Sequence, residues 1–332
     1  MVKQHVRIKQ RQRGYSESQY VQSVIELMAA GGDCLEDIER QRSDAGLKLL
    51  LGELPLAEAV RFFLYGFHDE KLLERRPEEE AFVAPESEPL AGLWEVNREV
   101  VLKASRKEEP KQATIDQDAT VVKRHKEQSR MTYLGERGYQ PVINYWVEQG
   151  LILSDEFRDG NVAAGMACLT SSLRAVRALP QSVETIYFRS DSAAYQHKVL
   201  DKMREGVEHN GKKVPVYFAI SADVSDGRSG GKIASLSESA WKPLRKLTEK
   251  GLIEGRKEWA ELEFIPSAAS VKKDMKPDRY LAIRGRPWQT ELFSDANSYL
   301  SLLRRGHQPV GDGGRGAVAL AAPALWERGE GA

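Results

Sequence analysis

The chain lacks an excess of charge of either sign and contains few cysteines. Lysine plus arginine and aspartate plus glutamate both number 49 in 332 residues, so the net charge indicates no partner. The two cysteines, Cys34 and Cys168, are far apart and have no metal-ligand spacing. They indicate reduced, buried thiols of a cytosolic protein.

Long apolar runs are also missing. No stretch approaches the eighteen consecutive apolar residues of a transmembrane helix, so we expect no membrane partner. The basic start has no apolar segment behind it, which does not fit a secretory signal. The hydrophobic content of 41% is enough for a folded core. We therefore expect a cytoplasmic globular protein, and its length favours two domains.

Basic side chains gather at the start of the chain. The first thirteen residues contain no acid and five basic residues, namely Lys3, Arg7, Lys9, Arg11 and Arg13. Such an arm can neutralise DNA phosphates. It is equally typical of a solvated, disordered terminus, and the sequence alone leaves both interpretations open.

Residues 1–67 are predicted to form a small helical domain. Ser16 and Gln19 form a capping-box pattern that begins a helix, and Gly31-Gly32 ends it. Asp33 is the predicted cap of a second helix, and Pro55 precedes a third. Short helices behind a basic arm are found in DNA-binding units, but also in ordinary helical caps. The acidic, proline-containing stretch that follows makes residues 68–111 a predicted linker.

Residues 112–222 contain a different pattern. Apolar, β-branched runs predict strands at 113–122, 141–147, 151–157, 185–188 and 214–220, and helical periodicity predicts helices at 163–179 and 193–208. A turn at 148–150 predicts a hairpin between the second and third strands. The order strand, hairpin, helix, strand, helix, strand predicts an α/β fold with a mixed sheet, as in a ribonuclease H-like core.

The remaining residues divide into two parts. Residues 223–300 form a mixed segment, with a predicted helix near 235–250 and a strand-like run at 280–284. Residues 301–332 are rich in glycine, alanine and arginine and have neither helical nor strand periodicity. We expect this tail to be disordered.

Two aspartates lie at the ends of predicted neighbouring strands. Asp118 is in the first strand, and Asp191 follows the fourth. Two carboxylates brought together from separate strands are ligands for a hard cation such as Mg²⁺, which supports phosphodiester chemistry. The alternative is that both are structural turn aspartates, exposed to solvent.

Several motifs, taken in order, resemble one known family. They are the region from Tyr15 to Gly52, the run from Asp116 to Thr120 followed by His125-Lys126, the run from Tyr133 to Pro141, the run from Asp155 to Asn161, and Arg189-Ser190-Asp191-Ser192. Together they resemble the DDE transposases of bacterial insertion sequences, specifically the thirteen-eighty group. The resemblance extends over roughly residues 14–300.

The resemblance implies a ribonuclease H-like domain in which three acidic residues hold two Mg²⁺ or Mn²⁺ ions and DNA is cut and rejoined. Asp118 takes the place of the first acid and Asp191 that of the second, with Asp116 as the runner-up for the first. The implied partners are insertion-sequence ends and target DNA in the bacterial nucleoid, and a homodimer is left open. Residues 223–300 fit the family's β-rich insertion. Basic residues near this site that can contact phosphates are Lys123, Lys126 and Arg189.

The chain departs from the family pattern at the third acid. The family places Tyr, Arg, Glu and Lys on a late helix, but here Tyr299 is followed by Leu302 where the arginine is expected. Glu327 and Glu330 lie in the aperiodic tail and are poor candidates. We expect a degenerate copy, with a frameshift near residue 300 and a shortened start.

Two other interpretations remain open. The chain can be a non-catalytic DNA-binding or oligomerising remnant of a transposase. It can also be an unrelated metal-dependent nuclease that uses a helix acid, Glu238 or Glu249, as its third ligand.

Overall fold

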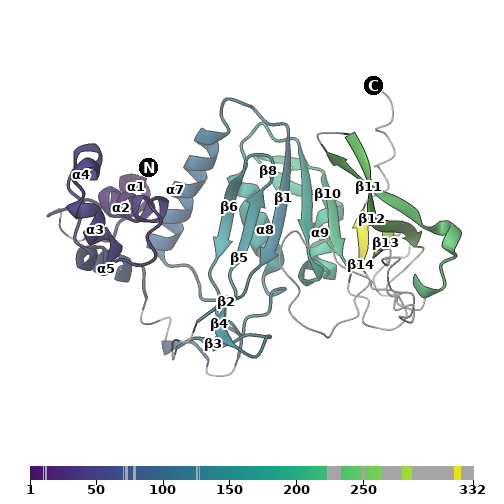
Figure 1. Ribbon diagram of the computed structural model, residues 1–332, viewed down its shortest axis with the longest axis horizontal. Coiled ribbons are helices and arrows are strands. Elements are labelled where there is room, and N and C mark those ends of the chain that lie inside the picture. Colours follow the sequence, from purple (N-terminus) through teal and green to yellow (C-terminus); the bar gives the residue numbers. More distant parts are fainter. Residues whose placement is uncertain are drawn as a thin grey trace.

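The fold is seen in a computed structural model (Figure 1). The structure describes residues 1–9, 11, 13–69, 71, 74–77, 80–124, 126, 128–222, 233–248, 251–262, 279–285 and 318–322. Within these residues no helix is long and apolar enough to cross a membrane. The helical part and the sheet lie side by side along the longest axis, joined by a long helix.

Five short helices form the amino-terminal part. They are α1 (Val2–His5), α2 (Glu17–Ala29), α3 (Asp37–Ser43), α4 (Ala45–Leu51) and α5 (Ala57–Tyr65). The capping box at the start of α2 is confirmed, because the Ser16 hydroxyl accepts from the Gln19 N–H and the Gln19 side chain accepts from the Ser16 N–H. A small core from α2, α3 and α5 holds these helices together.

The start of α3 differs from the sequence prediction. Asp33 does not cap this helix. Instead, the carboxylate of Asp37 accepts hydrogen bonds from the N–H groups of Asp33 and Cys34, 3.0 and 3.2 Å away. Both cysteines are free thiols. Cys168 is buried as predicted, but Cys34 lies in this turn and is exposed, so the prediction of burial is wrong for Cys34.

Helix α7 (Glu88–Ala104) lies inside the segment that was predicted to be a linker. It begins at Ser87 with Pro89 in its first turn, where a missing N–H costs nothing. Val101 is buried in the main core, and Asn97 donates to the Ile152 carbonyl oxygen, 2.9 Å away. Residues 88–104 are therefore packed against the sheet, and the linker prediction is wrong for them.

The predicted mixed sheet is confirmed. Its central strands are β1 (Gln112–Ala119), β5 (Val142–Trp146), β6 (Leu151–Glu156), β7 (Thr185–Ser190) and β10 (Val216–Ser221). The order is β10-β7-β1-β5-β6, with β7 parallel to β1 and β10, and the β5–β6 hairpin antiparallel. A mixed α/β architecture is thus established.

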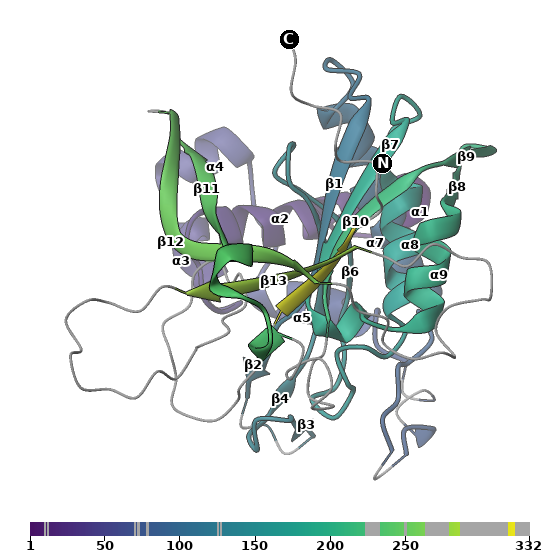
Figure 2. The ribbon, with the colours of Figure 1, turned by 90° about the vertical axis from the view of Figure 1, so that its right-hand side faces the viewer.

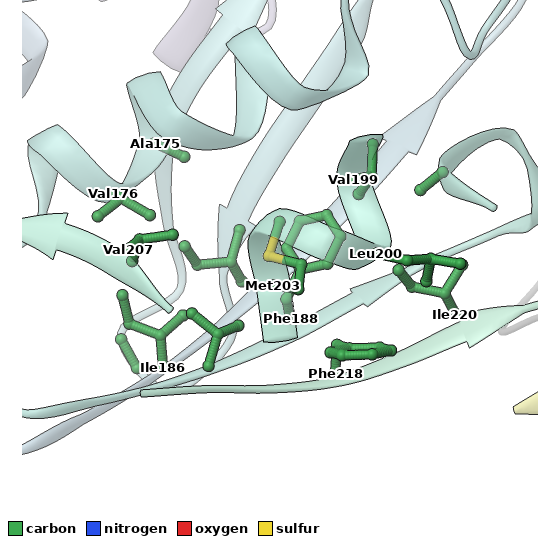
Figure 3. Close-up of a cluster of buried hydrophobic side chains, with 14 of the residues drawn as sticks. Ala175, Val176, Ile186, Phe188, Val199, Leu200, Met203, Val207, Phe218 and Ile220 are labelled. Carbon is green, nitrogen blue, oxygen red and sulfur yellow. The ribbon is translucent and has the colours of Figure 1, made fainter. Parts of the chain in front are cut away.

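Helices α8 (Cys168–Ala178) and α9 (His197–Glu205) cover one face of this sheet (Figure 2). Strand residues such as Ile186, Phe188 and Phe218 point toward Val176 and Met203 on these helices (Figure 3). Burial of each such side chain contributes about 1.5–3 kcal/mol, so this layer fixes the positions of the strands.

Two small sheets accompany the large one. The first joins β2 (Val122–Lys123), β3 (Arg130–Met131) and β4 (Arg137–Tyr139) in the order β2-β4-β3. It lies beyond the carboxyl end of β1 in both views (Figures 1 and 2). The second is the hairpin of β8 (Val207–His209) and β9 (Lys212–Val214).

The carboxyl-terminal part extends the large sheet. It contains β11 (Lys242–Thr248), β12 (Gly251–Leu262), β13 (Arg279–Gly285) and β14 (Val318–Ala322), which gives the order β11-β12-β13-β14-β10. The strand-like run at 280–284 is confirmed. The helix predicted near 235–250 is wrong for the described residues of this range, because Glu238–Ala240 form a 3-10 turn and Lys242–Thr248 form β11.

The predicted aperiodic tail contains β14, which pairs with β10 and β13. The prediction of no regular structure is therefore wrong for residues 318–322. Tyr299, Leu302, Glu327, Glu330 and the proposed frameshift position lie outside the described residues, as does Glu249.

Candidate functional site

The register of β1 and β7 places Asp118 and Asp191 at neighbouring positions. The last paired residues of these parallel strands are Gln117 and Ser190; Asp118 is the next residue of β1, and Asp191 directly follows β7. Adjacent strands lie about 4.8 Å apart, and the two aspartates come from the same end of neighbouring strands. The predicted pairing of the first and fourth core strands is confirmed.

Asp191 also shapes the backbone at the end of β7. Its Oδ1 accepts a hydrogen bond from the Ala193 N–H at 3.0 Å, and it is the N-cap of the 3-10 turn Ser192–Ala194. This bond fixes the direction in which the carboxylate points. Asp118 is exposed and pairs with Ile143 of β5.

Asp116 lies in a different environment from Asp118. It lies opposite Arg189 in the β1–β7 register. Arg189 Nε donates to Asp116 Oδ1 at 2.8 Å, and its Nη2 donates to Oδ2. Asp116, the alternative candidate for the first catalytic acid, is thus paired with Arg189, which was predicted to bind DNA.

Sequence reasoning missed a buried polar layer beneath β1. Gln117 Nε2 donates to Asn144 Oδ1 at 2.9 Å and to Ser172 Oγ at 3.0 Å. Asn144 Nδ2 donates to Ser154 Oγ at 3.0 Å and to Ser171 Oγ at 2.8 Å. All five side chains are at most 4% exposed. The layer connects β1, β5, β6 and α8, and its member Gln117 directly precedes Asp118 in β1.

Arg158 and Cys168 lie on the same side of the sheet. The Arg158 side chain is fully buried and donates to Glu156 Oε1 at 2.7 Å. Burial raises the pKa of the Cys168 thiol to about 12, with the charge of Asp191 adding to the rise and that of Arg158 opposing it. The Cys168 thiol is therefore protonated at neutral pH. Arg158 lies within the family-like motif from Asp155 to Asn161, and this motif was the sequence signal that could have identified it as a residue of the site region.

Described residues of the basic arm contact the rest of the protein. Lys3 lies in α1, and His5 Nε2 contacts Glu99 Oε1 of α7 at 2.7 Å. A Cβ at Gly92 of α7 would lie 2.2 Å from the His5 carbonyl oxygen, so this approach requires glycine. Lys9 Nζ donates to the carbonyl oxygens of Arg13 and Tyr15, both 2.5 Å away.

The arm is not brought to the aspartate pair. Arg7 lines a cavity of about 700 Å³ between α1, α7 and α8, together with Trp94, Arg174 and Arg177. Helix α7 stands between α1 and β1 (Figure 1). Of the basic residues predicted near the site, Lys123 forms an ion pair with Glu136 at 2.5 Å, and Lys126 is exposed. Both follow the end of β1 that carries Asp118.

One known protein family matches the part of the chain that contains these residues. A family model described as transposase DDE domain group 1 matches residues 2–210, which is well over half of the chain and includes Asp118 and Asp191. The chain belongs to this transposase family. No curated protein sequence matches the chain.

The donor set of this transposase domain fits a hard divalent cation. DDE transposases use divalent metals such as Mg²⁺, and carboxylate oxygens are the ligands that Mg²⁺ prefers. Among the described residues, no three His, Cys, Asp or Glu side chains form a group that could hold a metal. Asp118 and Asp191 offer two carboxylates at the shared end of β1 and β7.

Glu238 is poorly suited to be the third ligand. It lies in the 3-10 turn before β11, so it is not the helix acid that was expected. Arg284 Nη1 donates to Glu238 Oε1 at 2.7 Å, and this hydrogen bond lowers the pKa of the Glu238 carboxyl. Glu238 thus already has a cationic partner.

Proposed function

We propose that this protein is a DNA transposase in which Asp118 and Asp191 together hold Mg²⁺ or Mn²⁺ at the edge of a ribonuclease H-like sheet. The register that makes the two aspartates neighbours is the observation that carries the proposal. Family membership supports DNA as the substrate.

The reaction is an in-line substitution at phosphorus. The oxygen of water or of a DNA 3′-hydroxyl forms a new bond to phosphorus and releases its proton to solvent, the existing P–O3′ bond breaks, and the leaving oxygen takes up a proton. When bound, a divalent cation stabilises the charge on the attacking and leaving oxygens. Asp191 is oriented by its bond to the Ala193 N–H, and Asp118 is positioned by β1 and the polar layer beneath it.

We further propose that this copy is catalytically incomplete. The sequence near Tyr299 and Leu302 does not contain the family's Tyr, Arg, Glu and Lys set. The frameshift interpretation is tested by translating the other two reading frames of the gene downstream of residue 300. A family-like segment in either frame supports it, and no such segment in both frames rules it out.

The second candidate function is a non-catalytic DNA-binding remnant, which the same departure near residue 300 favours. Cleavage of DNA in the presence of Mg²⁺ separates it from an active enzyme. The third interpretation, an unrelated nuclease, loses support because Glu238 is paired with Arg284.

Metal binding tests the proposed site without requiring activity. Titration with Mn²⁺, followed by electron paramagnetic resonance, should show binding by the wild-type chain. Asp118→Asn and Asp191→Asn should each weaken it strongly, because each removes a ligand charge from a hard-cation site. Asp201→Asn on α9 is the matched control, since Asp201 pairs with Arg204 at 2.6 Å and lies outside the site. Unchanged affinity in both site variants would refute the assignment.

A further inference from the structure

The small sheet of β2, β3 and β4 presents apolar side chains to solvent. Tyr133 is 72% exposed and Leu134 is 53% exposed, and both lie in the turn between β3 and β4. Phe157 is 68% exposed and packs on Tyr139 of β4, with ring centroids 4.7 Å apart. Single exposed apolar residues are ordinary, but a cluster on one small unit indicates a binding surface.

The turn that carries Tyr133 and Leu134 is ordered. The Thr132 N–H donates to the Glu136 carbonyl oxygen at 2.8 Å, and the Gly135 N–H donates to the Thr132 carbonyl oxygen at 3.0 Å. Gly135 has a φ of +76°, which glycine adopts without strain. Thr132 is only 5% exposed, so the two neighbouring apolar side chains project from a fixed base.

The base of the small sheet is anchored to the rest of the protein. Arg76 forms an ion pair with Asp159 at 2.7 Å, and its two terminal nitrogens donate to the Gln128 carbonyl oxygen. A Cβ at Gly160 would lie 2.6 Å from the carbonyl oxygens of Arg130 and Gly138, so the loop after β6 packs tightly beneath the sheet. These contacts hold the small sheet in a fixed position relative to the large sheet.

Charge indicates what this surface contacts. Residues 120–139 contain five basic and two acidic side chains. The basic ones are Lys123, Arg124, Lys126, Arg130 and Arg137. Lys123, Arg124 and Lys126 are exposed, whereas Arg130 and Arg137 donate to the carbonyl oxygens of Pro77 and Ser129. Exposed basic groups on the same small unit as apolar side chains complement DNA, because the basic groups meet phosphates and the apolar tip meets bases.

Position supports the same ligand. The small sheet begins at Val122, three residues after the end of β1, at the edge of the large sheet that carries Asp118 and Asp191. DNA whose phosphate lies at that edge must pass close to the small sheet (Figures 1 and 2).

We propose that the β3–β4 turn is a DNA wedge, in which Tyr133 and Leu134 enter the base stack beside the phosphate at Asp118 and Asp191. This inference rests on the proposed function. Apolar side chains inserted between base pairs unstack them, and an aromatic ring stacks on the exposed base. Lys126, which is exposed, contacts the DNA backbone beside the opened step.

The test compares two DNA probes in EDTA, so that binding is measured without metal or cleavage. One probe is a short duplex of arbitrary sequence, and the other is the same duplex with one unpaired, bulged nucleotide. A protein that inserts a side chain between bases binds the bulged probe more tightly, because the bases at the bulge are already partly unstacked and less free energy is needed to separate them. The wild-type chain should bind the bulged duplex at least about fivefold more tightly, in line with the energy of one base stack.

Three kinds of variant distinguish insertion of Tyr133 into the base stack, contact of Lys126 with phosphate, and a general effect on folding. Tyr133→Ala should abolish the preference for the bulged probe, and Tyr133→Phe should retain it. Lys126→Ala should weaken binding to both probes equally. Tyr145→Ala is the matched control, because Tyr145 is an exposed tyrosine of β5 outside the small sheet.

A preference that survives Tyr133→Ala, or no preference in the wild-type chain, overturns the wedge and leaves the metal site untouched. Wild-type protein that binds neither probe also overturns it and points to a protein partner for this surface. Loss of Mn²⁺ binding in the Asp118→Asn and Asp191→Asn titration remains the separate test of the proposed function.

Discussion

At the scale of single residues, neighbouring acids on one strand have different roles. Asp116 and Asp118 are two positions apart and lie on the same face of β1. Asp116 is engaged by Arg189 across the strand pair, whereas Asp118 lies beside the position of Asp191. We propose Asp118, rather than Asp116, as the metal ligand, because the register places it next to Asp191.

This difference predicts that Asp116 is dispensable for metal binding. Asp116→Asn alone leaves the charge of Arg189 uncompensated near the site, so the informative variant is Asp116→Asn combined with Arg189→Gln. The double variant should bind Mn²⁺ much like the wild-type chain, and Asp118→Asn should not. A double variant as deficient as Asp118→Asn would make Asp116 a ligand.

At the scale of elements, local patterns in the sequence predicted the core well. The capping box at Ser16, the β5–β6 hairpin and the strands β1, β7 and β10 all depend on short-range signals. Helix α7 was missed because the proline and glutamate residues around its start are typical of a linker. Strand β11 was missed because its mixed polar and apolar residues have no period of two.

The polar layer was missed for another physical reason. Inward positions of β1 are occupied by Ala113, Ile115 and then Gln117, so the last inward residue breaks the apolar alternation. Its partner Asn144 comes from a different strand, 27 residues away, and no local pattern joins them. Such long-range pairs can be recognised only once the register is known.

Asn144→Ala should destabilise the protein through this layer. Removing the amide takes the Asn144 partner from Ser154 and Ser171 and one of several bonds from Gln117, which costs about 1–3 kcal/mol for each group left unsatisfied. Urea unfolding measures the change in the free energy of unfolding. Gln22→Ala, at an exposed site on α2, should change it by less than about 0.5 kcal/mol. Equal stability of the two variants would contradict the account of the layer.

The basic arm should contribute to DNA binding through charge alone. Each phosphate contact adds about one unit to the slope of log affinity against log salt. Replacing Lys3, Arg7, Arg11 and Arg13 together with alanine should therefore reduce the slope by up to about four units. Lys9→Ala should change it less, since Lys9 donates to backbone carbonyl oxygens. An unchanged slope in the quadruple variant would show that DNA does not contact the basic arm.

At the scale of the whole molecule, the large sheet joins sequence-distant parts. Strand β14, near the carboxyl end, lies between β10 and β13 and connects the central strands to β11–β13. This topology was not predictable, because the alanine-rich segment of β14 resembles the aperiodic residues around it. The two proposed site aspartates lie at the end of β1 and directly after β7.

We expect the chain, as it stands, not to perform strand transfer. A cation site without its third acid stabilises the leaving oxygen poorly, and losses of this kind cost several kcal/mol, or orders of magnitude in rate. The assay offers the DNA that flanks the gene as donor and a plasmid as target, with Mg²⁺. A chain in which a family-like Tyr, Arg, Glu and Lys segment has been restored is the positive control. Joining by the unmodified chain would show that another acid completes the site.

The most direct measurement of the central claim is cleavage of the protein by its own bound metal. Fe²⁺ in place of Mg²⁺, with ascorbate and peroxide, generates radicals that cut the backbone beside the ion. The account predicts two cuts, one near Asp118 and one near Asp191, both suppressed by excess Mg²⁺ and both lost in Asp118→Asn. Cuts at only one of these positions, or at other positions entirely, would contradict a metal site shared by the two aspartates.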